Sequence, residues 1–109
     1  MDTRKLRSAY IRVSHVGPLA TISLTGSFCY SSHVIFRETY NRILNIEAIN
    51  EIEIDCSEIE YLDSAALGML LVLKDKADFA HKMLVLSRPS QVALSTFELV
   101  GFQFSFHIH

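Results

Sequence analysis

The sequence is poor in cysteine: Cys29 and Cys56 are the only two in 109 residues. Two thiols have neither the number nor the spacing of a disulfide framework or of a structural zinc site. Proteins with few cysteines and no disulfide framework are typical of reducing compartments. We therefore expect a protein of the cytoplasm.

Long hydrophobic runs are missing as well. The longest apolar stretch, residues 65–73, is far shorter than the ~18 residues that a membrane-spanning helix needs. The opening residues carry charge, and no apolar segment long enough for export follows them. We expect neither membrane insertion nor export.

Basic residues are also scarce, since 10 Lys and Arg stand against 12 Asp and Glu, for a net charge of −2. A nucleic-acid-binding protein would carry a concentrated basic face, so we do not expect nucleic acid as a partner. The acidic residues gather in residues 47–63, where Lys and Arg are absent. This run is either a solvated face or a surface that steers a basic partner.

Signatures of catalysis and of metal binding are lacking. Of the five histidines, His15, His33 and His81 fall on different expected elements, whereas a zinc site needs three or four converging ligands. His107 and His109 are expected on the polar face of one strand and lack further ligands. The sequence contains no G-x-S-x-G elbow, Walker loop or dinucleotide fingerprint. We expect no metal, no cofactor and no enzymatic activity.

The residues that are present indicate a packed globule. Half of them are hydrophobic and a fifth are charged. The length suits one domain, and repeats and linkers are absent, so we predict a single domain over residues 1–109 and a monomer.

Alternation of apolar and polar residues predicts strands at residues 10–17 and 19–25, joined by a turn at Gly17-Pro18, and again at residues 51–55 and 83–87. The same pattern predicts a last strand with four apolar residues on one side, namely Phe102, Phe104, Phe106 and Ile108.

Helical spacing predicts three helices between these strands. The first covers residues 35–44, with Ser31 and Ser32 as N-cap candidates. The second covers residues 65–80, and its apolar first two turns are expected to be deeply buried. The third starts at residues 87–89, with Pro89 in its first turn, and stops at Gly101.

The order of these elements predicts an α/β fold with a mixed central sheet of about five strands. Strands covered on both faces read as continuous apolar runs, and most strands here alternate. We therefore expect the helices to pack mainly on one face of the sheet.

Asp63 and Ser64 open the second helix, and either side chain can cap it. Ala66 and Leu67 stand where a capping box would need Glu or Gln, so no capping box forms. Backbone N–H groups at this end therefore stay available to an external anion.

The stretch IDCSEIEYLDSAALGML, residues 54–70, resembles the signature of STAS domains, the family of bacterial anti-sigma factor antagonists. LTGSF at residues 24–28 and the order of elements match as well. The resemblance implies that a partner serine kinase, an anti-sigma factor of the histidine-kinase-like ATPase fold, phosphorylates Ser64. Phosphorylation would end binding to that partner, and the carboxylates that precede Ser64 would add to the negative charge. Removal of the phosphate by a PP2C-type phosphatase would restore binding.

The resemblance places the docking surface on the start of this helix and the segment before it. The residues expected to bind the partner are Ser57, Tyr61, Asp63, Ser64, Ala65, Leu67 and Gly68. Two features depart from the family pattern: Ala65 and Ala66 replace Ser or Thr and Gly, and Cys29 stands where an acidic residue is common. Ser57, in an expected loop, is a weaker second candidate for the phosphorylated residue.

Three other interpretations stay open. Ser64 can simply cap a buried helix, with no further role. The chain can be a STAS subunit of an ABC-type lipid transporter that works without phosphorylation. It can also be a small-ligand-binding or enzymatic α/β domain that uses its acidic end.

Overall fold

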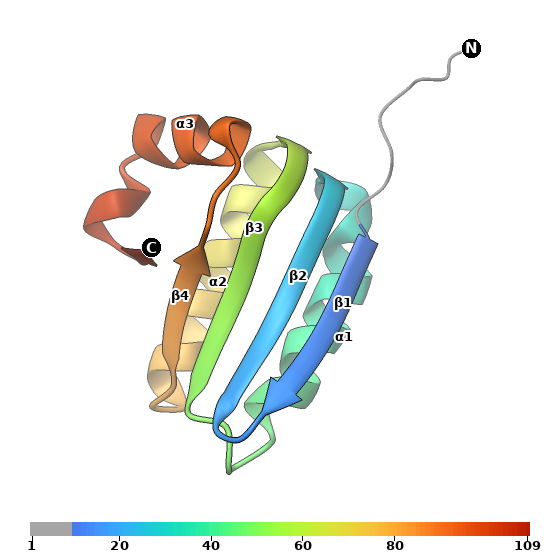
Figure 1. The fold of residues 1–109 in the computed structure, drawn as a ribbon, viewed down its shortest axis with the longest axis vertical. Helices are drawn as coiled ribbons and strands as arrows, with labels where there is room; N and C mark the ends of the chain where they lie inside the picture. The colour runs from blue at the N-terminus through green and yellow to red at the C-terminus, as the bar shows by residue number, and fades with distance from the viewer. Residues whose placement is uncertain (1–9) are drawn as a thin grey trace.

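A five-stranded mixed sheet, with its strands in the order β1-β2-β3-β4-β5, is the framework of the computed structural model. Figure 1 labels β1 to β4. The structure describes residues 10–109, so residues 1–9 of the predicted domain lie outside the described part. The strands are β1 (Tyr10–Val16), β2 (Leu19–Phe28), β3 (Glu51–Leu62), β4 (Met83–Ser87) and β5 (His107–Ile108). The helices are α1 (His33–Leu44), α2 (Ser64–Phe79) and α3 (Gln91–Leu99). This is the predicted α/β fold.

The first two strands form the predicted hairpin, and all later strands join the sheet in parallel. Gly17 turns the chain between β1 and β2 with φ +58°, a left-handed conformation that glycine adopts without strain. The carbonyl of Pro18 accepts hydrogen bonds from the backbone of Asn50 and Glu51, which ties the hairpin to the start of β3. β2 and β3 therefore enter the sheet side by side.

α1 and α2 cover the same face of the sheet, behind the strands in Figure 1. Ile22 of β2, Ile54 of β3 and Leu70 of α2 have no exposed surface. Each such side chain stabilises the fold by about 1.5–3 kcal/mol. The prediction that helices pack mainly on one face is confirmed, because only one face of each alternating strand is apolar.

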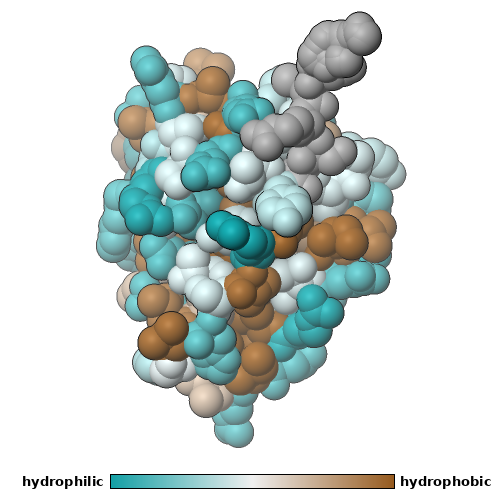
Figure 2. Space-filling view, turned by 45° about the vertical axis from the view of Figure 1, so that its right-hand side comes forward, coloured by the Kyte–Doolittle hydropathy of each residue, from teal (hydrophilic) through white to brown (hydrophobic). Residues whose placement is uncertain are grey.

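The other face of the sheet carries polar side chains such as Thr21, Ser23 and Glu53, which are partly exposed. Figure 2 shows the side of the molecule that includes β1 and this open face, where hydrophobic residues lie among hydrophilic ones.

α2 is less deeply buried than its composition predicts. It buries a narrow stripe of four residues, Ala66, Leu70, Leu73 and Ala77. Leu71 and Val72, in its second and third turns, are 43% and 47% exposed. The expectation of deep burial was wrong because α2 lies in the outer layer, where only the side toward the sheet is covered.

The predicted C-terminal strand was wrong over most of its length. Only His107 and Ile108 pair with β4, while Phe102–Phe104 form a short 3-10 helix. Phe102 stacks on Phe97 of α3 at a ring distance of 5.6 Å, and Phe106 lies 4.5 Å from Phe102. This aromatic cluster decides the local structure, and Phe104 is left 87% exposed. His109 lies beyond β5, so it shares no strand face with His107.

Two helix starts also differ from the expected ones. Pro89 precedes α3, and Ser90 caps it by accepting a 3.2 Å hydrogen bond from the backbone of Ala93. α1 begins at His33, two residues before the expected start. Ser32 occupies the N-cap position as predicted, but its side chain makes no capping bond. The predicted stop of α3 is confirmed, since Gly101 follows the helix with φ +81°.

Candidate functional site

Asp63, between β3 and α2, caps the second helix. Its backbone is extended, and its Oδ1 accepts a 2.9 Å hydrogen bond from the backbone N–H of Ala66. The first intrahelical bond runs from Leu67 N–H to the Asp63 carbonyl at 3.2 Å. Of the two cap candidates in the sequence, the structure uses Asp63 and leaves the hydroxyl of Ser64 out of the cap.

The second carboxylate oxygen of Asp63 holds a loop from elsewhere in the chain. Oδ2 accepts a 3.2 Å hydrogen bond from the backbone N–H of Tyr30, just after β2. This contact is possible because β2 and β3 are parallel neighbours, whose carboxyl ends meet at one edge of the sheet. One carboxylate thus organises both the start of α2 and the loop beside it.

Ser64 is the first residue of α2 and is exposed. Its hydroxyl makes no hydrogen bond to any residue within 10–109. The N–H groups of Ser64 and Ala65 have no intrahelical acceptors, and the helix dipole places positive partial charge at this end. The site therefore presents a free hydroxyl beside two backbone donors.

The structure brings together most of the residues predicted to bind a partner. Tyr61, at the end of β3, is 43% exposed, and Leu67 is partly buried against the core. Gly68 lies one turn after Ser64 on the same side of α2. A Cβ built on Gly68 would meet no atom within 4 Å, so open space lies in front of it.

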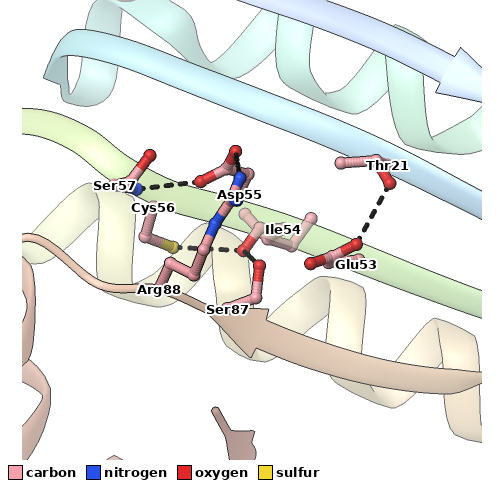
Figure 3. Close-up of polar contacts among 8 residues, drawn as sticks. All are labelled: Thr21, Glu53, Ile54, Asp55, Cys56, Ser57, Ser87 and Arg88. Carbon is pink, nitrogen blue, oxygen red and sulfur yellow. Dashed lines mark hydrogen bonds and ion pairs between the residues drawn. The ribbon is translucent and has the colours of Figure 1, made fainter.

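Ser57 does not belong to this group. It lies inside β3, not in a loop, and its backbone N–H donates to Asp55 Oδ1 at 3.0 Å (Figure 3). It precedes Leu62 by five positions along the strand, about 16 Å at ~3.3 Å per residue. The strand was predicted to end at residue 55, so Ser57 was expected in a loop. In the structure β3 continues to Leu62, which lies opposite Phe28 of β2.

The acidic run is spread along β3 and is not gathered around Ser64. Glu53 accepts a 3.2 Å hydrogen bond from Thr21, and Asp55 forms an ion pair with Arg88 (Figure 3). Burial raises the pKa of Asp55, but hydrogen bonds from Ser57 and Arg88 outweigh burial and hold the pKa below its ordinary value. Asp63 is the carboxylate directly at the helix start.

Two neighbouring residues at this edge, one exposed and one partly exposed, were missed by sequence reasoning. Tyr30 is 66% exposed, and its ring stacks on His33 at 4.6 Å. His33 Nδ1 lies 2.9 Å from the Tyr30 carbonyl oxygen. More than thirty residues separate Tyr30 from Ser64, and only the pairing of β2 with β3 brings them to one edge.

No group of three or more His, Cys, Asp or Glu residues in the described part of the chain is arranged to hold a metal ion. Burial, with a smaller effect of Asp55, raises the pKa of the Cys56 thiol to about 12.

Among residues 10–109, no helix has the length and apolar character to cross a membrane.

Sequence comparisons give two matches. The family model described as "Mlab, STAS domain" matches residues 11–104. The STAS-domain containing protein PA14_20770 of Pseudomonas aeruginosa (strain UCBPP-PA14) is 34% identical over 87 residues, which cover 75% of this chain and 84% of that protein.

Solved structures with the same fold include anti-sigma factor antagonists. Unphosphorylated SpoIIAA superposes with a TM-score of 0.78 at 16% identity, over 92% of this chain and 88% of that one. The phosphorylated form of SpoIIAA from Bacillus gives 0.73 at 15% identity, over 92% and 91%. An antagonist from Mycobacterium paratuberculosis gives 0.81 at 15% identity, over 93% and 85%.

Proposed function

The chain belongs to the STAS domain family, and we propose that it is a phosphorylation-controlled protein-binding regulator with Ser64 as its phosphoacceptor. Unphosphorylated, it binds a partner through the start of α2. Phosphorylated, it releases that partner. It is a substrate of enzymes and not an enzyme itself, and it works as a monomer in the cytoplasm.

One observation carries the proposal: at a helix start that Asp63 caps, Ser64 is exposed and its hydroxyl makes no hydrogen bond within the described residues. A kinase can reach this hydroxyl without disturbing the cap. A phosphate there would meet the positive end of the helix dipole, worth typically 0.3–1 kcal/mol. The modified domain would therefore stay folded. SpoIIAA, which shares the fold, has been solved in both unphosphorylated and phosphorylated forms.

Release follows from electrostatics at the docking surface. A phosphoserine adds roughly −1.5 to −2 charges at neutral pH, and the carboxylate of Asp63 is next to it in sequence. Burying an uncompensated charge in an interface costs several kcal/mol. About 5.5 kcal/mol converts a complex from 99:1 to 1:99, so one phosphate is large enough to work as a switch.

The partners in this proposal come from the family resemblance. The binding partner and kinase is an anti-sigma factor of the histidine-kinase-like ATPase fold, and a PP2C-type phosphatase reverses the reaction. Tyr30 and Tyr61 flank the site with exposed rings, and tyrosine is enriched among residues that dominate binding energies at interfaces. Both support a protein as the ligand.

Two replacements at Ser64 test the proposal. Ser64→Ala should retain the kinase-like partner in pull-downs from native cells, and Ser64→Asp should release it. Ser95→Asp is the matched control, because Ser95 is an exposed serine on α3. Mass spectrometry of the native chain should find phosphate on Ser64. Equal capture by Ser64→Ala and Ser64→Asp would refute the switch.

A second candidate function is that of a subunit of an ABC-type lipid transporter, and the matched family model carries the name Mlab. In this role the same surface holds an ATPase or membrane subunit of an ABC-type lipid transporter without phosphorylation. Both Ser64 variants should then retain that subunit. Capture of no partner by either variant would favour a small-ligand-binding or enzymatic domain.

A further inference from the structure

A groove runs between α1 and α2 and contains two hollows. The first, of about 200 Å³, lies between residues 33–40 of α1 and Met69 and Val72 of α2. The second, of about 420 Å³, lies between residues 41–45, at the end of α1 and its C-cap, and residues 75–80, at the end of α2 and its C-cap. Both helices start at the same edge of the sheet, so the first hollow is the one nearer Ser64 (Figure 1).

The first hollow combines an apolar floor with an exposed cation. Phe36 and Tyr40 are almost fully buried, and Val72 is 47% exposed at the rim. Arg37 also lines the hollow and is exposed, and its guanidinium makes no hydrogen bond or ion pair with any residue from 10 to 109. Among the described residues, no carboxylate lines this hollow. It suits an apolar side chain with a negative charge close by.

The spacing of the hollows matches a helix. Arg37 of the first and Leu44 of the second are seven residues apart on α1, about 10.5 Å at 1.5 Å per residue. A helix that docks here presents side chains at positions i and i+7 with the same separation. Phe79, 89% exposed, adds an aromatic surface beside the second hollow.

The charges along the groove indicate the sign of its ligand. Arg37 lines the first hollow, and Lys76 and Asp75 line the second, so cations outnumber carboxylates. Complementary charge at an interface favours the matching partner and disfavours others. The groove therefore favours an acidic helix over a basic one.

We propose that this groove binds an acidic amphipathic helix of the regulator's protein partner, with an apolar side chain in each hollow and a carboxylate at Arg37. This inference rests on the proposed function, because it names a second contact of the same partner. Met69 follows Ser64 by five residues, about 8 Å along the helix axis. That is close to one Debye length at physiological salt, so a phosphate on Ser64 would repel the acidic helix, although salt reduces the repulsion at this distance.

Photo-crosslinking in native cells tests the groove. With Val72→p-benzoylphenylalanine, mass spectrometry of the adduct should identify a net-negative segment whose sequence has apolar residues at helical spacing. Val92→p-benzoylphenylalanine is the matched control, because Val92 on α3 is 45% exposed, like Val72. A crosslink to a basic segment, to a second copy of this chain or to lipid would overturn the inference, as would a yield no higher than the control.

Charge reversal provides the second arm. Adding Arg37→Glu should lower the Val72 crosslink roughly three- to tenfold, whereas Arg42→Glu, on the exposed last turn of α1, should leave it unchanged. Equal yields would overturn the inference. Adding Ser64→Asp separates the two proposals: if Arg37→Glu weakens the crosslink and Ser64→Asp does not, the groove stands and the switch fails. The opposite result retains the switch and rejects the groove.

Discussion

Alanine at Gly68 is expected to stabilise the isolated protein. Glycine in a helix interior is less favourable than alanine by about 0.8–1 kcal/mol, and the added methyl group would meet no atom within 4 Å. Nothing in the described chain therefore requires glycine at this position. For a domain of ~100 residues, a gain of 1 kcal/mol corresponds to a rise of roughly 4–8 °C in the midpoint of thermal unfolding.

Gly101 provides the matched comparison, since the same replacement there should have the opposite sign. Its φ is +81°, and a Cβ would lie 3.7 Å from the ring of Phe104. The left-handed conformation costs a residue with a Cβ about 1–2 kcal/mol, so Gly101→Ala should destabilise by that order. Urea unfolding of both variants and of the unchanged protein measures each difference in unfolding free energy. The slope of this free energy against urea concentration should be the same in all three proteins.

The interface adds a second readout for Gly68→Ala. If a partner approaches α2 closely at Gly68, the variant should bind that partner more weakly although it is more stable. Gly68→Ala that destabilised the isolated chain would refute the reasoning, because it would mean that internal packing needs the glycine. Gain of stability with unchanged binding would remove Gly68 from the docking surface.

Three further predictions concern stability. Asp63→Ala should lower the free energy of urea unfolding by about 1–2 kcal/mol, because the hydrogen bond from Ala66 to the cap is lost. Ser64→Ala should lower it by under about 0.5 kcal/mol. Equal losses would contradict the assignment of the cap. Lys82→Met should lower the free energy of unfolding by about 1.5–3 kcal/mol, since the buried Lys82 ammonium donates hydrogen bonds to two loop carbonyls. An unchanged urea midpoint would show that these bonds contribute nothing to stability. Asp55 has a lowered pKa when folded, so its stabilising contribution is present above its ordinary value of 3.8 and is lost as the pH falls below it. The difference in unfolding free energy between the unchanged protein and Asp55→Asn should therefore shrink below about pH 4, and a difference that does not change with pH would refute the assignment.

The alternation of apolar residues was sufficient to predict most of the fold. Ile52 and Ile54 point to the helices while Glu51 and Glu53 stay partly exposed, as a period of two requires. The same period failed at residues 102–108, where the phenylalanines find better partners in a ring cluster with Phe97. Periodicity records which residues are apolar, and it does not record which distant surface will bury them.

The candidate site divides in the same way. The local sequence at Asp63 and Ser64 determined that a helix starts here with a cap and a hydroxyl, because capping involves residues only three positions apart. The tertiary structure decided that Asp63 is the cap, that Tyr30 shares its carboxylate, and that Ser57 lies far along β3. It also created the groove between α1 and α2. These features depend on strand pairing and helix packing between segments far apart in the chain, which no local pattern encodes.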